Sequence, residues 1–197
     1  MNEIRRQMAA AAPRARPPTE ELLARAERAG LVDVAYDEVD SPIGTLVVAT
    51  TDKGLVRVGF PTETEGVVLD ELARRLSPRV VKAPRKVASV ARELDEYFAG
   101  RRKRFDVPLD WALVGPYARK VLRATAAIPF GKVSTYREVA RKAGNPAASR
   151  AAGNALGSNP IPVVVPCHRV LRTNGSLGGY GGGLDVKEHL LRLEGVL

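Results

Sequence analysis

The chain is poor in metal-binding and redox side chains. Among its 197 residues it has one cysteine, Cys167, and two histidines, His168 and His189. One cysteine excludes an intramolecular disulfide, and these three side chains are too few for the usual structural zinc site. No apolar run approaches the roughly 20 residues of a membrane-spanning helix, and the N-terminus lacks the apolar stretch of a secretory signal. We therefore expect a cytoplasmic protein that binds no metal, cofactor or membrane.

Acidic residues are scarce in one part of the chain. Residues 101–150 contain 12 basic and 3 acidic residues, whereas residues 31–100 contain 9 and 12. The excess of basic over acidic residues in 101–150 alone equals the net charge of the whole chain, +9. A basic block beside helical patterns favours a polyanionic partner such as nucleic acid. A solvated basic surface is the alternative.

The pattern of the first half predicts an extension and an α+β domain. Residues 1–30 are interpreted as a disordered stretch, residues 1–18, followed by a short helix from an N-cap at Thr19 to Gly30. Residues 31–109 form the predicted N-terminal domain. β-branched runs between Val32 and Phe60, separated by turns at 41–44 and 52–54, predict three antiparallel strands, and apolar spacing predicts helices at 65–76 and 86–99.

The second half, residues 110–197, reads as a helical domain after a proline-punctuated linker. A helix is expected at 116–126. Thr135 and Glu138 match a capping box for the next one, and Asn145 with Pro146 predicts the start of a third that ends at Gly157. The last two helices have the spacing of a helix-turn-helix. Arg150 lies on a face of alanine and glycine that could approach a partner closely, although a surface ion pair is the alternative reading.

Residues 159–170 are predicted to be an apolar strand, bracketed by prolines, that leads to Cys167 and His168. A cysteine nucleophile needs a thiolate, which a neighbouring imidazole can generate. Adjacent side chains of an extended chain point to opposite faces, so His168 reaches the sulfur only through a sharp turn or a water. On spacing alone, an inert core cysteine is the more common case.

The string PCHRV at 166–170 resembles the active-site motif of the O6-alkylguanine-DNA alkyltransferases. The resemblance extends in order and spacing to three blocks of the C-terminal half, IPFGKVSTYREVA, GNPAASRAAGNALGSNPIPVVVPCHRV and GGYGGGLDVKEHLLRLEG. DSPIGTLVVATTDKGLVRVGF and LDEYFAGRRKRFDVPLD look like the less specific N-terminal domain of that family. The resemblance implies an α+β fold, with a ribonuclease-H-like N-terminal domain and a C-terminal, winged-helix-like helix-turn-helix domain that carries the cysteine.

The resemblance also implies a reaction. Cys167 would accept the alkyl group of O6-alkylguanine, and less efficiently of O4-alkylthymine, in one irreversible transfer. His168 would accept the thiol proton through a water, supported by Glu194. Asn159 would brace the active-site loop by side-chain hydrogen bonds. Tyr136 would crowd the flanking phosphate and protonate the departing guanine.

Duplex DNA with an alkylated guanine is the implied partner, bound by a monomer largely without regard to sequence. Arg150 would fill the gap left by the flipped nucleotide, and Tyr180 would stack on the extruded base. The other implied contacts are Ala151 and Gly153 on the helix in the minor groove, and Gly181, Val170 and Lys187 around the substrate.

The chain departs from the family at three positions. Leu122 stands where relatives commonly have tryptophan and Tyr117 where phenylalanine is usual, which affects packing. Gly181 stands where some have serine, which predicts more room for large alkyl groups. A non-catalytic lesion-recognition protein is the rival function, but such relatives replace the acceptor cysteine that this chain retains. A cysteine hydrolase would turn over repeatedly, and no separate oxyanion motif supports that reading.

Overall fold

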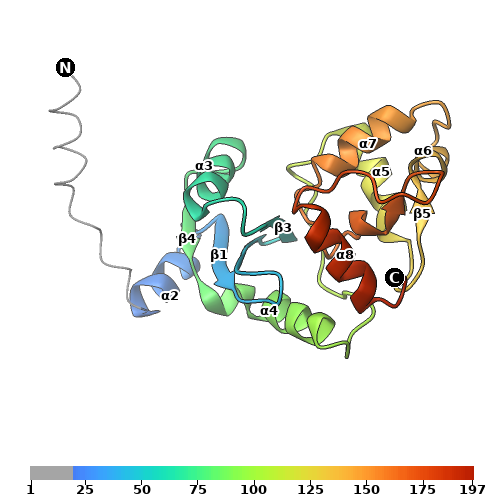
Figure 1. Cartoon of the computed structure of the whole chain (residues 1–197). Coiled ribbons are helices and arrows are strands. Elements are labelled where there is room, and N and C mark those ends of the chain that lie inside the picture. The colour runs from blue at the N-terminus through green and yellow to red at the C-terminus, as the bar shows by residue number, and fades with distance from the viewer. Residues whose placement is uncertain (1–19) are drawn as a thin grey trace, which may run out of the picture. The chain divides into compact units, whose positions relative to one another are not determined.

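The computed structural model describes residues 20–197 (Figure 1). The chain divides into a unit that ends at Leu31 and a compact unit, Val32–Leu197. In the first, α2 (Glu20–Arg28) is the predicted short helix, and Gly30 follows it with a φ of 65°. The disorder predicted for residues 1–18 and the N-cap predicted at Thr19 lie outside the described residues.

The sheet of the second unit contains the three predicted strands and one more. β1 (Val34–Val39), β2 (Leu46–Thr51) and β3 (Gly54–Gly59) pair antiparallel. β4 (Val80–Lys82) pairs parallel with β1, so the order is β3-β2-β1-β4. The sequence pattern does not predict β4, because three residues are too few to show an alternating pattern.

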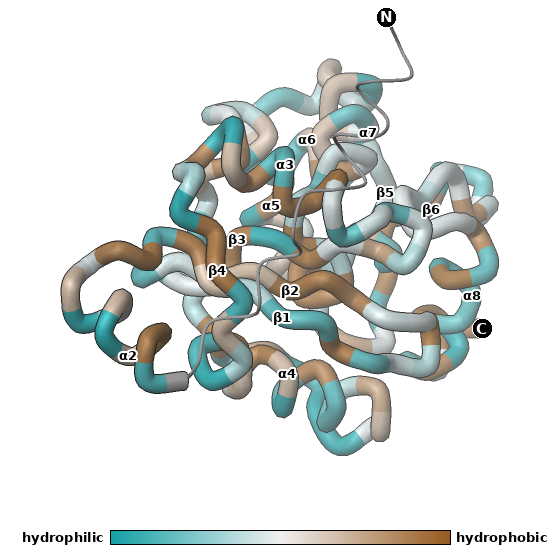
Figure 2. Tube along the Cα trace, turned by 90° about the vertical axis from the view of Figure 1, so that its left-hand side faces the viewer, coloured by the Kyte–Doolittle hydropathy of each residue, from teal (hydrophilic) through white to brown (hydrophobic). Residues whose placement is uncertain are grey.

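Two helices cover the two faces of this sheet. Residues of β2 alternate between them, as side chains of a strand must. Leu46 and Val48 belong to the core cluster that contains apolar residues of α4 (Pro84–Phe98), whereas Val47 and Ala49 belong to the cluster that contains those of α3 (Glu65–Arg75). Burial on both faces explains why β2 is hydrophobic along most of its length (Figure 2).

The C-terminal half is helical. Its helices are α5 (Pro116–Ala126), α6 (Tyr136–Lys142), α7 (Ser149–Gly157) and α8 (Leu184–Leu193). A short parallel pair, β5 (Ser134–Thr135) with β6 (Val170–Leu171), joins the segment before α6 to the segment after the cysteine. Helices α5, α6 and α7 contact one another pairwise. The side chain of Leu122 is buried where these helices pack together, with 1% of its surface exposed.

One apolar core runs from the sheet into these helices. The cluster on the α4 face also contains Val121 of α5, Val139 of α6 and Leu190 of α8. The domain boundary predicted between residues 109 and 110 falls inside this compact unit and stays a prediction. Among residues 20–197, no helix combines the length and apolar character required to cross a membrane. The cytoplasmic location also stays a prediction.

The predicted helix-turn-helix forms with one shifted boundary. The Thr135 hydroxyl accepts from the Glu138 N–H, as a capping box requires, but the Glu138 carboxylate binds Arg141 instead of returning to Thr135. The start predicted for α7 at Asn145 is wrong. Because the Ala148 N–H donates to the Asn145 carbonyl three residues back, residues 145–148 form a separate turn and α7 begins at Ser149.

Candidate active site

The segment that leads to Cys167 is folded into turns, so the strand predicted over 159–170 is wrong. Val165 N–H donates to the Ile161 carbonyl, and Cys167–Arg169 form one turn of 3₁₀ helix. Val163 between them has a φ of 71°, which is costly for a β-branched side chain. Three prolines remove the N–H groups that a strand ladder needs, and this local chemistry outweighs the β-propensity of the valines. A sharp turn at Cys167, one of the two ways in which His168 could reach the sulfur, is therefore present.

Asn159 holds this turn and contacts the sulfur. Its side-chain Nδ2 donates to the Val165 carbonyl at 2.9 Å and to Cys167 Sγ at 3.2 Å, while its Oδ1 accepts from the Ile161 N–H at 3.0 Å. Burial raises the pKa of the Cys167 thiol, although the Asn159 amide opposes that effect. The thiol is therefore protonated at rest and requires a base before it can attack.

Glu194 lies buried at the C-terminal end of α8 and accepts hydrogen bonds from four residues in three parts of the chain. Its Oε1 accepts from His168 Nε2 at 2.9 Å, from Arg169 Nη2 at 2.8 Å and from the Tyr97 hydroxyl at 2.7 Å. Its Oε2 accepts from Arg169 Nε at 2.8 Å and from the Gly131 N–H at 3.3 Å. Burial alone would raise the pKa of Glu194, but the hydrogen bonds from His168 and Arg169 outweigh it and lower the pKa to about 2.

His168 is positioned as a neutral base. Its side chain is fully buried, and burial lowers its pKa despite the hydrogen bond to Glu194. Since Nε2 faces a carboxylate, Nε2 carries the ring proton and the lone pair of Nδ1 is available. Nδ1 has no hydrogen-bond partner within the described part of the chain. An imidazole in this state accepts a proton at Nδ1 and passes positive charge toward Glu194.

Cys167 lines a cavity with a volume of about 360 Å³. Tyr136 from α6 and Gly153 from α7 form one side of it, and Tyr180 and Gly181 from the glycine-rich loop form another. The predicted substrate residues Tyr180 and Gly181 thus lie beside the cysteine, as do the predicted DNA-binding residues Tyr136 and Gly153. Burial raises the pKa of Tyr136, so its hydroxyl stays protonated and can donate.

Other predicted residues lie outside this cavity. Arg150 and Ala151 are on the exposed face of α7, and no ion pair of Arg150 occurs among residues 20–197. Lys187 is buried and donates to the Val170 carbonyl at 2.7 Å and to the Leu177 carbonyl. Burial lowers the pKa of Lys187 to about 8. Val170 therefore holds Lys187 and does not line the cavity; the pair fixes the two ends of the loop that carries Tyr180.

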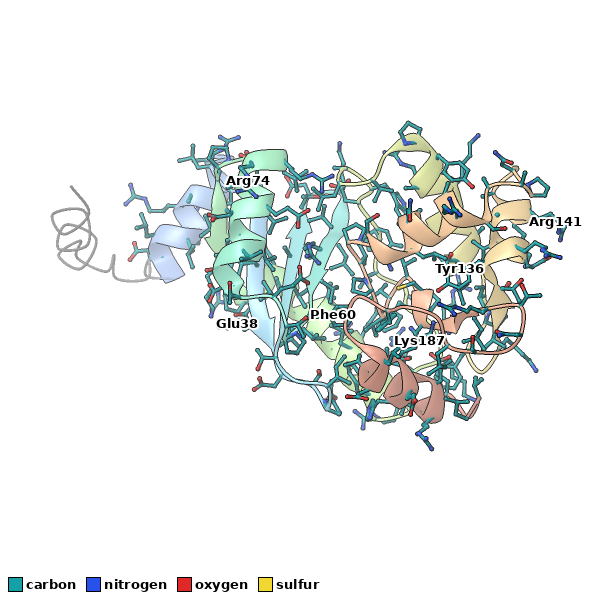
Figure 3. The ribbon with its side chains drawn as sticks, turned by 45° about the horizontal axis from the view of Figure 1, so that its top comes forward. Glu38, Phe60, Arg74, Tyr136, Arg141 and Lys187 are labelled. Atoms are coloured by element: carbon teal, nitrogen blue, oxygen red, sulfur yellow. The ribbon has the colours of Figure 1, made fainter. Side chains whose placement is uncertain are left out.

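Three residues that contact the site were not predicted from the sequence. Arg169 binds Glu194 through two nitrogens, and the Tyr97 hydroxyl donates to the same carboxylate. Phe60, just after β3, packs edge-on against Tyr180 with ring centroids 5.5 Å apart, and lies between the sheet and α8 in Figure 3. A Cβ at Gly182 would lie 2.8 Å from its ring. Tyr97 and Phe60 come from the sheet half, so no local motif around the cysteine could indicate them.

Comparison with known proteins matches both halves of the chain. Residues 34–111 match the ribonuclease-like domain of 6-O-methylguanine DNA methyltransferase, and residues 116–196 match the DNA binding domain of the same family. The chain belongs to the 6-O-methylguanine DNA methyltransferase family. By class it is a methylated-DNA–protein-cysteine methyltransferase, an enzyme of DNA repair by alkyl transfer.

Individual relatives agree with this membership. The methylated-DNA–protein-cysteine methyltransferase of Mycolicibacterium paratuberculosis is 43% identical over 162 residues, which is 82% of this chain and 92% of the relative. That of Methanosarcina acetivorans is 41% identical over 161 residues, or 81% and 97%. The crystal structure of Mycobacterium tuberculosis OGT in complex with DNA is 38% identical, covers 81% of this chain and 92% of its own, and superposes with a TM-score of 0.70.

Proposed function

We propose that this chain repairs O6-alkylguanine in duplex DNA by transferring the alkyl group irreversibly to Cys167, with O4-alkylthymine as a poorer substrate. One observation carries the proposal: the cysteine that lines the cavity is followed directly by a neutral, fully buried imidazole whose Nδ1 is unpartnered among the described residues and whose Nε2 is held by Glu194. Cys167 is thus a nucleophile held as a protonated thiol, and His168 is the base that can deprotonate it.

The transfer balances without any co-reactant. The Cys167 thiol gives its proton to His168 Nδ1 through a water, and the sulfur attacks the alkyl carbon. The new S–C bond forms as the C–O6 bond breaks, and its electron pair goes to the purine, which takes a proton at N1 from the Tyr136 hydroxyl. His168 returns its proton to solvent and Tyr136 regains one. The products are guanine and S-alkylcysteine, and since a thioether is a poor leaving group, each molecule acts once.

The target base must leave the stack to reach Cys167, because the cysteine is buried and its sulfur is reached through the cavity that it lines. Tyr180 would stack on the extruded base, and the N–H of Gly181 would donate to O6. Arg150 would enter the duplex in place of that base, with Ala151 and Gly153 against the minor-groove walls. The small side chains of α7 support a close approach to the backbone that reads no sequence.

Intact-protein mass spectrometry tests this proposal. The chain is mixed with an equimolar duplex that contains one O6-methylguanine, beside a Cys167→Ser variant. We expect the wild type alone to gain one CH₂ unit, and to gain no more when the duplex is in excess. Tight, lesion-selective binding by the wild type without any gain in mass would instead support a non-catalytic lesion-recognition protein.

A further inference from the structure

The hydroxyl of Tyr97 belongs to the sheet half but contacts the catalytic centre. Tyr97 is on α4, its side chain is fully buried, and its O–H donates to Glu194 Oε1 at 2.7 Å. Ninety-seven positions separate the two residues in the sequence. The contact therefore depends on the docking of α4 against the C-terminal helices.

The shared oxygen makes this contact relevant to the base. Glu194 Oε1 accepts from Tyr97 and from His168 Nε2 at the same time. Each donor takes part of the negative charge of the carboxylate, so the strength of one hydrogen bond depends on the other. Without the Tyr97 donor, more of that charge faces His168, and the protonated imidazole becomes easier to form.

Packing fixes the direction of the Tyr97 hydroxyl. Its ring lies 5.3 Å from the rings of Phe98 and Phe105 and 6.2 Å from that of Phe130, measured between centroids. Aromatic contacts of this kind restrict both side-chain torsions. Helix α4 itself is held on β1 and β2. The donor is therefore in place before any substrate arrives.

We infer that Tyr97 is a positioning residue for the alkyl transfer, which keeps His168 neutral and correctly oriented by sharing Glu194 with it. The inference rests on the proposed function for its reaction but concerns the resting protein. Tyr97 touches no substrate and acts through Glu194. The N-terminal half would then contribute to catalysis as well as to the fold.

Several charged or titratable groups face His168 and Glu194 and must stay unchanged in any test. They are Arg169 beside both, Lys187 on α8, and Cys167 and Tyr180 on the cavity side. The test variant should therefore remove the hydroxyl of Tyr97 and nothing else. Tyr97→Phe does this and keeps the aromatic packing.

Tyr117 on α5 provides a matched control. Its hydroxyl is also buried, but it has no hydrogen-bond partner within the described residues. Tyr117→Phe therefore removes an identical group from the same core without altering Glu194. Comparing the two variants separates the loss of a buried hydroxyl from the loss of a donor to the carboxylate.

The first measurement is an NMR titration of the His168 imidazole, which needs no DNA. The chain has two histidines, so a His189→Gln variant assigns the signals. We expect the pKa of His168 to rise by about one unit in Tyr97→Phe and to stay unchanged in Tyr117→Phe. An equal pKa of His168 in wild type and Tyr97→Phe would overturn the inference, whatever the protein does to DNA.

The second measurement is the single-turnover rate of methyl transfer between pH 5 and 9. Transfer requires neutral His168, so a higher pKa moves the acid limb of the profile to higher pH. We expect the rate of Tyr97→Phe relative to wild type to fall by up to about tenfold toward pH 5, and to be nearly unchanged near pH 8, where His168 is neutral in both proteins. A uniform loss across the range, matching the loss of folded protein in a melting curve, would mean a purely structural role. If the wild type transferred nothing, the proposed function would fail while the titration still decided the inference.

Discussion

The two halves of this protein treat positive charge in opposite ways. In residues 34–111 most basic side chains meet carboxylates; Arg57 binds Glu63 and Glu71, and Arg102 meets three acidic residues. In residues 116–196 seven exposed cations have no ion pair among the described residues, namely Lys120, Arg123, Lys132, Arg137, Lys142, Arg150 and Arg172. The sheet half neutralises itself, whereas the helical half retains a positive field that suits a polyanion.

The carboxylates of the helical half differ in the same way. Glu194 is fully buried between His168 and Arg169, whereas Asp33 of the sheet half pairs with Arg79 where both side chains are substantially exposed. Exposed pairs add little to stability because water competes with them. Buried ones are costly to break, because the remaining partner is left charged and unpaired. Apart from the exposed pairs Glu138–Arg141 and Glu188–Arg192, charge in the helical half is thus buried around Glu194 and Lys187 or left unpaired on the surface of the described part of the chain.

Glu194→Gln should give the largest effect and make this contrast quantitative. It leaves Arg169 buried without its counter-ion, so we expect a loss of about 3–5 kcal/mol in the free energy of unfolding. Transfer to Cys167 should slow at least about 100-fold, because His168 loses the group that supports its protonated form. Urea unfolding and single-turnover assays measure the two. Asp33→Asn is the control, and we expect no resolvable change in its free energy of unfolding or its transfer rate. Losses comparable to those of Glu194→Gln would mean that the buried and the exposed carboxylate do not differ in this way.

The same carboxylate predicts an acid-dependent stability. The pKa of Glu194 is about 2 in the folded protein and near 4.5 for the free side chain. A lowered folded-state pKa stabilises the protein above the unfolded value, and that contribution disappears as the pH falls from 4.5 toward 2. Wild type should therefore lose stability across this window more steeply than Glu194→Gln. Parallel curves would mean that the pKa of Glu194 is the same in the folded and unfolded protein.

Neutralising unpaired cations should weaken DNA binding, with a smaller but clear effect. In a triple alanine variant of Arg137, Lys142 and Arg150, we expect the slope of log K against log salt to fall by up to about 2.7, since each phosphate contact contributes about 0.9. A matched triple alanine variant of Arg79, Lys82 and Arg101, which form ion pairs in the sheet half, should keep the wild-type slope. Fluorescence anisotropy over a salt series compares them. Equal slopes would show that pairing does not distinguish the halves.

Phe60 tests whether the sheet half also shapes the cavity. Phe60→Leu removes the ring that supports Tyr180 and approaches Gly182, so we expect benzyl transfer to gain about three- to tenfold relative to methyl transfer. Gly181→Ser should lower the same ratio, because it adds a side chain inside the cavity. Val56→Ala, at an equally buried site on the other face of the sheet, controls for lost packing. An unchanged benzyl-to-methyl ratio in Phe60→Leu would confine substrate selection to the helical half.

The same division separates what the sequence could predict from what it could not. Strands with β-branched alternation and helices with clear end signals, such as Thr135 and Gly157, formed as expected because their determinants are local. The turn before Cys167 was misread, because three prolines and the strained Val163 defeat a pattern based on β-propensity. The role of Tyr97 could not be predicted, because it depends on a contact with Glu194, 97 positions away, which no local pattern encodes.

Two lysines give the subtlest test, because burial and pairing move their pKa values in opposite directions. In the sheet half, the hydrogen bond to Glu38 raises the pKa of the exposed Lys82. In the helical half, burial lowers the pKa of Lys187 from 10.5 to about 8. Between about pH 8 and pH 10.5 the unfolded chain binds more protons at Lys187 than the folded chain does, so this lysine makes the free energy of unfolding rise with pH. Lys82 adds no such rise, and its contribution is lost only above 10.5.

Comparing Lys187→Met and Lys82→Met by urea unfolding from pH 7 to 10 isolates these slopes. Lys187→Met also loses two hydrogen bonds to carbonyls, but that cost is nearly constant with pH and leaves the slope interpretable. We expect the difference in the free energy of unfolding between wild type and Lys187→Met to grow toward alkaline pH. The corresponding difference for Lys82→Met should not change with pH. A flat difference for Lys187 as well would mean that its ammonium is solvated in the folded protein. The loop that carries Tyr180 would then be held less tightly than its two carbonyl contacts indicate.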